Sequence, residues 1–308
     1  MAHVKNEITK SKLKTPKEQI TDILSDLLKV TAIALPDDVF ESLKKMQACE
    51  DSELSKELYS CIFDNLDKAE KLKRPLCQDT GVLQFFIKAG VRFPYLALLG
   101  DAIKDATQNA TSSVPLRHNV VESFDERNTG NNIGTLAPWC EWEIIDGDGL
   151  EIDVYLAGGG CTLPGRSKVL MPLEGYEGVV KFVFDTIVEW GVNACPPLVV
   201  GVGIGTCATT ASILSKKAIL RKIGSSNPNP KAADMERRMK IGLDNIGIGP
   251  LGLKGKQSVQ CVNIEYAAHH PATLGVGVTV GCWATRRGSI NIKNDLSYEI
   301  TSHKNKIN

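Results

Sequence analysis

The sequence has no long uninterrupted apolar segment. Its apolar runs are short and broken by glycine or proline, which excludes a transmembrane helix, because a span needs about 20 consecutive apolar residues. The N-terminal stretch is polar and has no apolar core, so we expect no signal peptide. These two absences predict a cytoplasmic protein.

An excess of charge of one sign is also absent. Lysine plus arginine and aspartate plus glutamate number 36 each, so no global field attracts nucleic acid or an anionic membrane. We expect neither partner. With 308 residues, of which 43% are hydrophobic, the chain is long enough to bury a sizeable core.

A disulfide framework is not expected either. The nine cysteines are an odd number, and without export they stay reduced. Cys49 and Cys61 lie in predicted helices, where we expect buried core residues, since a free cysteine behaves as a small hydrophobe. The other cysteines are left for ligand or core roles.

Hydrophobic periodicity predicts an α/β fold, with a helical N-terminal region and a mixed β-sheet flanked by helices. The helical part covers about residues 16–70 and begins at Thr15-Pro16, a helix-start pattern; the α/β part covers about 74–302. We expect flexible ends at 1–15 and 303–308. Strands are predicted at 82–87, 139–145, 150–156, 198–204, 259–264 and 274–280, and later helices at 95–109, 178–190, 208–221 and 231–245.

Three cysteines stand in strings rich in turn-forming residues: RPLCQDTG at Cys77, NACPPLVVGVGIG at Cys195 and TVGCWATRRG at Cys282. Thiolates on rigid turns bind iron–sulfur clusters, and a set of three leaves one iron without a protein ligand. An open metal position acts as a Lewis acid toward substrate. The alternative for the first string is a tight turn with a buried Cys77 and a capping Asp79.

Basic side chains in two further strings are candidate carboxylate clamps. Arg117 lies in PLRHN, and Arg166 and Lys168 follow the glycines Gly158, Gly159 and Gly160 in GGGCTLPGRSK. The arginine fork matches a carboxylate with two parallel hydrogen bonds, and consecutive glycines let a ligand approach the backbone. For either arginine alone, a surface charge is the alternative.

His270 precedes the glycine-rich strand that delivers Cys282. A histidine beside a metal centre and an anionic substrate suits proton transfer, because its pKa lies near neutrality. A hydrogen-bonded structural histidine is the alternative.

The glycines in GVGIGT, residues 201–206, invite comparison with a dinucleotide-binding loop. Thr206 occupies the place of the third glycine in that pattern, so a helix N-terminus that helps hold an anionic group is favoured instead.

Together these strings resemble the class I fumarases, a family of iron–sulfur hydro-lyases, in its two-subunit form, from about residue 16 to 302. CQDTG, NTGNN, the CPP-glycine segment and HHP…GCW are general to that family. GGGCTLPGRSKVLMPLEGYEGVVKFVF and KAILRKIGSSNPNPKAA are similar to its tartrate-type branch, with Cys161 where single-chain fumarases usually have serine.

The resemblance implies a role for each matching residue. It assigns a 4Fe-4S cluster with one labile iron to Cys77, Cys195 and Cys282. It places near the substrate Gln78, Asp79, Arg117 and a glycine of 158–160, with His270 close to the cluster. The catalytic base is then Asp79, His270 or a residue of another subunit.

The resemblance also implies dehydration of L(+)-tartrate, a small dicarboxylate, to oxaloacetate. A β subunit carries the rest of the active site, and an α2β2 heterotetramer is expected. One alternative is the α subunit of a class I fumarate hydratase, acting on malate and fumarate. The other is a non-catalytic protein with zinc on the thiolates, which the wide ligand spacing disfavours.

Overall fold

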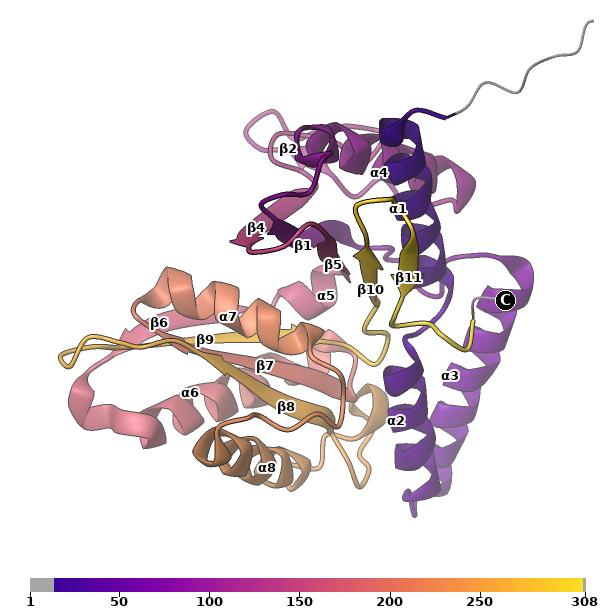
Figure 1. The fold of residues 1–308 in the computed structure, drawn as a ribbon. Helices are drawn as coiled ribbons and strands as arrows, with labels where there is room; N and C mark the ends of the chain where they lie inside the picture. The colour runs from indigo at the N-terminus through magenta and orange to yellow at the C-terminus, as the bar shows by residue number, and fades with distance from the viewer. Residues whose placement is uncertain (1–13, 307–308) are drawn as a thin grey trace, which may run out of the picture.

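Three helices precede the first strand in the computed structural model, which describes residues 14–306. They are α1 (Pro16–Ile33), α2 (Asp37–Ala48) and α3 (Glu53–Leu72), at the predicted positions (Figure 1). Thr15 caps α1: its hydroxyl accepts the Glu18 N–H at 3.3 Å, and the Glu18 carboxylate accepts the Thr15 N–H at 2.7 Å.

The prediction that Cys49 and Cys61 are buried is wrong, because both are exposed. Cys49 is the C-cap residue of α2 and lies beyond its buried face. Cys61 directly precedes the buried Ile62 on α3 and faces away from the core side of that helix. Helix membership was predicted correctly for Cys61, although its face was not, whereas Cys49 lies one residue beyond the end of α2.

Within residues 14–306 the strands form two mixed sheets and one two-stranded hairpin, where the sequence predicted one mixed sheet. The first has the order β11-β10-β5-β1-β4, with β1 parallel to β4 and antiparallel to β5. Its strands are β1 (Val82–Gly90), β4 (Trp139–Ile145), β5 (Leu150–Ala157), β10 (Arg287–Ile292) and β11 (Tyr298–Ile300). Helices α1 and α4 (Leu99–Ser113) pack on one face and share its core. A short hairpin, β2 (Val121–Glu122) with β3 (Arg127–Asn128), follows α4.

The second sheet has the order β6-β9-β7-β8. Its strands are β6 (Arg166–Leu170), β7 (Leu198–Gly205), β8 (Val259–Tyr266) and β9 (Leu274–Gly281). Helices α6 (Gly175–Trp190) and α8 (Pro230–Asp244) cover one face, and α7 (Ala208–Leu220) covers the other (Figure 1). A short helix, α5 (Gly159–Thr162), links the two sheets.

Helix α7 lies between the two sheets and explains the glycines of β7. A Cβ atom at Gly203 would lie 1.9 Å from the Ala211 carbonyl oxygen, and one at Gly201 would lie 2.2 Å from that of Ser215. Only glycine lets the helix backbone approach this closely. On its other side α7 contributes to a core with Phe86 of the first sheet. These glycines therefore serve helix packing.

Residues 303–306, at the end of the chain that we predicted to be flexible, contact the helical part of the chain. His303 is fully buried, with Nε2 3.4 Å from the Ala34 carbonyl oxygen, and Lys306 forms an ion pair with Glu70 at 2.6 Å. The predictions for residues 1–13 and 307–308 lie outside the described residues. Within the described part of the chain, no helix is long and apolar enough to cross a membrane.

Candidate functional site

Two of the cysteine strings meet at one end of the second sheet. Cys195 lies just before β7 and Cys282 just after β9, and these strands are antiparallel with Val199 opposite Gly281. The Trp283 N–H donates to the Cys195 carbonyl oxygen at 3.0 Å. Strand register therefore places both cysteines at the same sheet end.

Cys77 reaches the same place from the turn before β1. Cys77 and Cys282 pack on the same apolar cluster of α2 and α3. Burial, followed by the neighbouring thiols of Cys77 and Cys161, raises the pKa of Cys195. Cys195 itself adopts a left-handed backbone conformation with φ 54°, a costly geometry that is concentrated at functional sites. The structure thus brings together all three predicted metal ligands.

A fourth thiol, Cys161, joins this group and was not among the predicted site residues. Hydrogen bonds with Cys282 and Tyr155 lower the pKa of Cys161 to about 6, and the same contact with Cys161, together with burial, raises the pKa of Cys282. The sequence shows Cys161 only as a cysteine after three glycines. Its position became evident only from the packing of α5.

Asp79 links the first cysteine string to the three glycines. Its Oδ2 accepts the Gly159 N–H at 2.6 Å, and its Oδ1 accepts the Gly81 N–H at 3.0 Å and the Asn119 amide at 3.2 Å. Three donors therefore fix the carboxylate beside Gly158, where an added Cβ would lie 3.1 Å from Oδ2. Gly158 and Gly159 thus form the opposite wall of this turn, while Gly160 faces the Asn193 carbonyl oxygen.

Arg286 is a second site residue that the predictions missed. It is only 2% exposed, and its Nη1 donates to the Asp79 carbonyl oxygen at 2.6 Å. Its Nε has no hydrogen-bond partner among the described residues. A buried cation thus supports the Asp79 turn from the string that carries Cys282. The signal available in the sequence was an arginine four residues after the predicted ligand Cys282.

Arg117 is held close to this turn by its backbone. The Arg117 N–H donates to Thr80 Oγ1 at 2.9 Å, and its carbonyl oxygen accepts the Asn132 amide at 3.1 Å. Its side chain is exposed and forms no ion pair with any residue from 14 to 306. Gln78 is also exposed. The strings CQDTG, PLRHN and NTGNN therefore share one location, with a free guanidinium beside it.

Arg166 and Lys168 do not join this group within the chain. Arg166 pairs with Glu189 at 2.7 Å and stacks 5.4 Å from the Trp190 ring, and Lys168 lies 3.6 Å from Glu174. Both basic groups therefore lie along β6, beside α6, and are already paired with acidic partners.

His270 lies at the other end of the second sheet. It is exposed in the loop between β8 and β9, at the far left of Figure 1, and accepts the Ala272 N–H at Nδ1. Strand β9 has eight residues, so roughly 25 Å separates this loop from Cys282. His270 is therefore remote from the thiols of its own chain.

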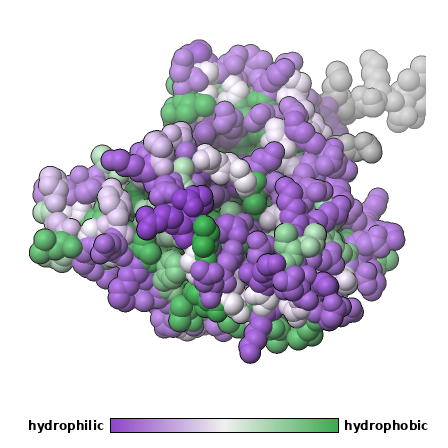
Figure 2. Space-filling model, turned by 90° about the horizontal axis from the view of Figure 1, so that it is seen from below, coloured by the Kyte–Doolittle hydropathy of each residue, from purple (hydrophilic) through white to green (hydrophobic). Residues whose placement is uncertain are grey.

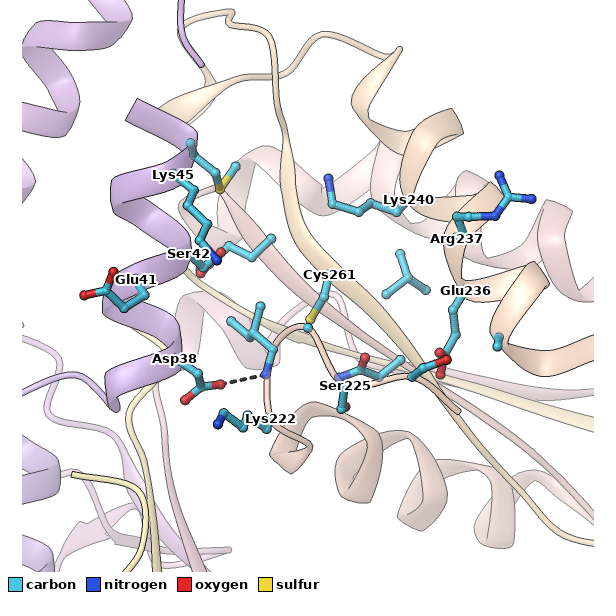
Figure 3. Close-up of a pocket in the computed structure, with 18 of the residues that line it drawn as sticks. Asp38, Glu41, Ser42, Lys45, Lys222, Ser225, Glu236, Arg237, Lys240 and Cys261 are labelled. Atoms are coloured by element: carbon cyan, nitrogen blue, oxygen red, sulfur yellow. Dashed lines mark hydrogen bonds between the residues drawn. The ribbon is translucent and has the colours of Figure 1, made fainter. Parts of the chain in front are cut away.

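A cavity of about 950 Å³ lies apart from these strings, between α2, the loop after α7, α8 and β8 (Figure 3). Its lining includes Asp38, Lys45, Lys222, Glu236 and Cys261 and none of the predicted site residues. Among residues 14–306, no three Cys, His, Asp or Glu side chains are grouped as ligands of a single metal ion.

Comparison with known proteins agrees with the motifs. The family model described as fumarate hydratase (Fumerase) matches residues 21–291, and the chain belongs to this family. It is 55% identical over 286 residues to L(+)-tartrate dehydratase subunit alpha of Escherichia coli (strain K12) and to that of Shigella sonnei (strain Ss046). Each alignment covers 92% of this chain and 94% of the relative. A relative from Methanocaldococcus jannaschii is 38% identical over 281 residues, 90% of this chain and 99% of its own. The resemblance to class I fumarases is confirmed.

Proposed function

We propose that this chain is the α subunit of an iron–sulfur hydro-lyase that dehydrates L(+)-tartrate to oxaloacetate. The observation that carries the proposal is the gathering of Cys77, Cys195 and Cys282 beside the Asp79–Gly159 hydrogen bond. The names of the 55% identical relatives favour tartrate. The description of the family model favours fumarate hydration, which is the second candidate.

The donor set fits a 4Fe-4S cluster with one labile iron. Three thiols from three separate turns suit a body larger than a single ion, and thiolates are the usual cluster ligands. The buried cation of Arg286, close to Cys282, favours the negative charge of such a group. When bound, the cluster supplies a Lewis acid for the departing hydroxyl. We place the enzyme in the cytoplasm, where thiols remain reduced.

The residues of the chain then bind and orient the substrate. We assign a substrate carboxylate to the free guanidinium of Arg117, with Gln78 beside it as a polar contact. The backbone of Gly158–Gly160 leaves room for close approach of the ligand. Asp79, fixed by three donors, is the proton-transfer group that we propose from this chain.

A β subunit is proposed to supply the remaining groups, in an α2β2 assembly. The names of the relatives, "subunit alpha", support a partner. Large apolar side chains exposed around β6 and the start of α6 also suit an interface: Leu163, Val169, Met171, Leu173 and Tyr176. Apolar areas interrupt the mostly hydrophilic face in Figure 2. Such an assembly is needed for the proposed roles of Arg166, Lys168 and His270. His270 is remote from the thiols of its own chain, so it can serve only the cluster of another copy.

The test is anaerobic cluster reconstitution of the chain co-expressed with its β partner. We expect iron and acid-labile sulfide, and faster dehydration of L(+)-tartrate than of malate. Cys77→Ser should lose both the cluster and activity, while Cys49→Ser, at the exposed C-cap position that follows α2, should retain both. Faster malate dehydration would establish the fumarate hydratase alternative. Zinc without iron or sulfide would contradict both enzymes.

A further inference from the structure

The cavity of about 950 Å³ between α2 and α8 is bordered by the open edge of a strand. Residues 260–263 of β8 line it, and β8 is an edge strand of the second sheet, with no strand of residues 14–306 on its outer side (Figure 3). Ile264 shows what this edge requires, because its N–H donates to Glu236 and its carbonyl oxygen accepts from Asn227, both at 2.7 Å. Two residues earlier, Val262 borders the cavity instead. The cavity therefore leaves backbone donors and acceptors of β8 open to a ligand.

Gln260 adds a buried acceptor without a partner to the same wall. Its side chain is 4% exposed, and its Nε2 donates to the Pro197 carbonyl oxygen at 3.3 Å. That bond fixes the orientation of the amide, so its oxygen is the atom left over. No donor among residues 14–306 reaches Oε1. A buried polar atom without a hydrogen bond is costly, which favours a ligand that supplies an N–H or an O–H.

Two basic groups of the lining have no acidic partner. Lys45 of α2 and Lys222 of the loop after α7 are exposed, and neither forms an ion pair within residues 14–306. They come from different walls of the cavity in Figure 3. Lys240, in the same lining, is by contrast paired with Asp244 at 2.7 Å. Two free ammonium groups select an anionic group such as a phosphate or a carboxylate.

The buried acidic side chains of the lining already have basic partners. Asp38 is paired with Arg287, and Glu236 is paired with Arg221 at 2.6 Å. The carboxylate of Glu41 points away from the cavity, on the outer side of α2 (Figure 3). An incoming anion therefore meets two free cations and no free buried carboxylate.

We propose that this cavity is a binding site for an organic anion about the size of a nucleotide. A donor on the body of the ligand bonds to Gln260 Oε1, and its phosphate or carboxylate lies between Lys45 and Lys222. Cavities of this volume hold ligands of that size, whereas a molecule as small as tartrate fills only part of the space. The site shares no residue with the proposed active site and goes beyond the proposed function.

The experiment is isothermal titration calorimetry of the αβ complex with AMP, L(+)-tartrate and inorganic phosphate as probes. AMP should bind, and phosphate alone should bind at least roughly tenfold more weakly, because it reaches only the lysines. Lys45→Ala and Lys222→Ala should each weaken AMP binding roughly threefold. Gln260→Met should weaken it roughly fivefold, the effect of about one lost hydrogen bond. Lys44→Ala, which removes the neighbouring lysine of α2 that does not line the cavity, should match wild type.

The tartrate titration distinguishes the two sources of the anion. It is repeated in Arg117→Ala, which removes the proposed substrate clamp of the active site. Tartrate binding that remains in this variant and weakens when Lys45→Ala is added identifies a hydroxy acid as the ligand. AMP binding without such a tartrate site identifies a nucleotide.

Three results would overturn the inference. The first is that neither AMP nor tartrate binds outside the active site. The second is binding that keeps its affinity in every cavity variant. The third is an equal loss in Lys44→Ala and Lys45→Ala, since surface charge alone would then account for binding. Melting curves show whether Gln260→Met has kept its fold, and the two exposed lysine variants test the site independently of that residue.

Discussion

The Asp79 carboxylate accepts the backbone N–H of Gly159 at 2.6 Å, joining the turn before β1 to the turn after β5. Strand register explains this contact. β1 and β5 are antiparallel, and Val82 lies opposite Ala157, so both turns emerge from the same end of the first sheet. Two sequence strings far apart in the chain thus form one site because the sheet aligns them.

Asp79→Asn should weaken this junction. Asparagine has one acceptor oxygen where aspartate has two, so one of the donors, the Gly159 or the Gly81 N–H, would face an amide nitrogen. We expect a loss of about 1–3 kcal/mol in the free energy of unfolding. Urea unfolding of the cluster-free chain measures it. Asp125→Asn, at an exposed loop position, should change stability by less than about 0.5 kcal/mol. Equal losses of stability in the two variants would contradict the role of the Asp79 carboxylate in joining the two turns.

The buried ion pair between Asp38 and Arg287 should be far more sensitive than a surface pair. Their side chains are 7% and 5% exposed, and Asp38 also accepts the Ile223 N–H at 2.6 Å. Asp38→Asn leaves Arg287 charged and buried without its counter-ion, which should cost about 3–5 kcal/mol. Asp67→Asn, which breaks the exposed pair with Lys71, should cost less than about 0.5 kcal/mol. Chemical denaturation of both variants measures the two losses of stability. Similar midpoints would refute the greater sensitivity of the buried pair.

The elements were predictable because each has a local signature, whereas their arrangement depends on distant contacts. The strand that begins at Val82 and the capped helix that begins at Pro16 lie where the pattern placed them. No pattern showed that the strands divide into two sheets, because α7 separates them only through tertiary packing. His303 was missed for the same reason, since a polar tail gives no sign of the buried place that it fills.

The candidate site shows the same limit. The cysteine strings and Asp79 carry turn chemistry that is visible in the sequence, and the structure brings them together. Arg286 and Cys161 join them only because strand ends and α5 meet there. His270 was also predicted for the site from its residue type, but it lies at the opposite end of the second sheet. The sequence therefore showed which residue types could form the site, but it did not show which of them lie close together in space.

Gly203→Ala and Gly100→Ala should have opposite effects. A Cβ at Gly203 would lie 1.9 Å from the Ala211 carbonyl oxygen, so α7 must move away from β7. We expect a loss of at least about 3 kcal/mol, as for overpacked cores. Gly100 lies in α4 with no atom within 4 Å of its added Cβ, so alanine should stabilise the chain by about 0.5–1 kcal/mol. Thermal unfolding measures both, and a stable Gly203→Ala chain would contradict the packing argument.

His303 should make the stability of the chain depend on pH below neutrality. Burial lowers the pKa of His303 from 6.5 to about 4, against smaller opposing effects of the Ala34 carbonyl and Asp37. The unfolded chain therefore binds a proton more readily between these values, so stability is fully present above about pH 6.5 and is lost as the pH falls toward about 4. Between pH 7 and pH 5 the loss from this group is about 2 kcal/mol. His303→Gln removes the titrating group, so its unfolding free energy should fall by about 2 kcal/mol less than that of wild type over the same interval. Urea unfolding at both pH values compares the two chains and cancels the other ionisable groups that they share. Identical pH dependence in the two would show that His303 is not held neutral by burial.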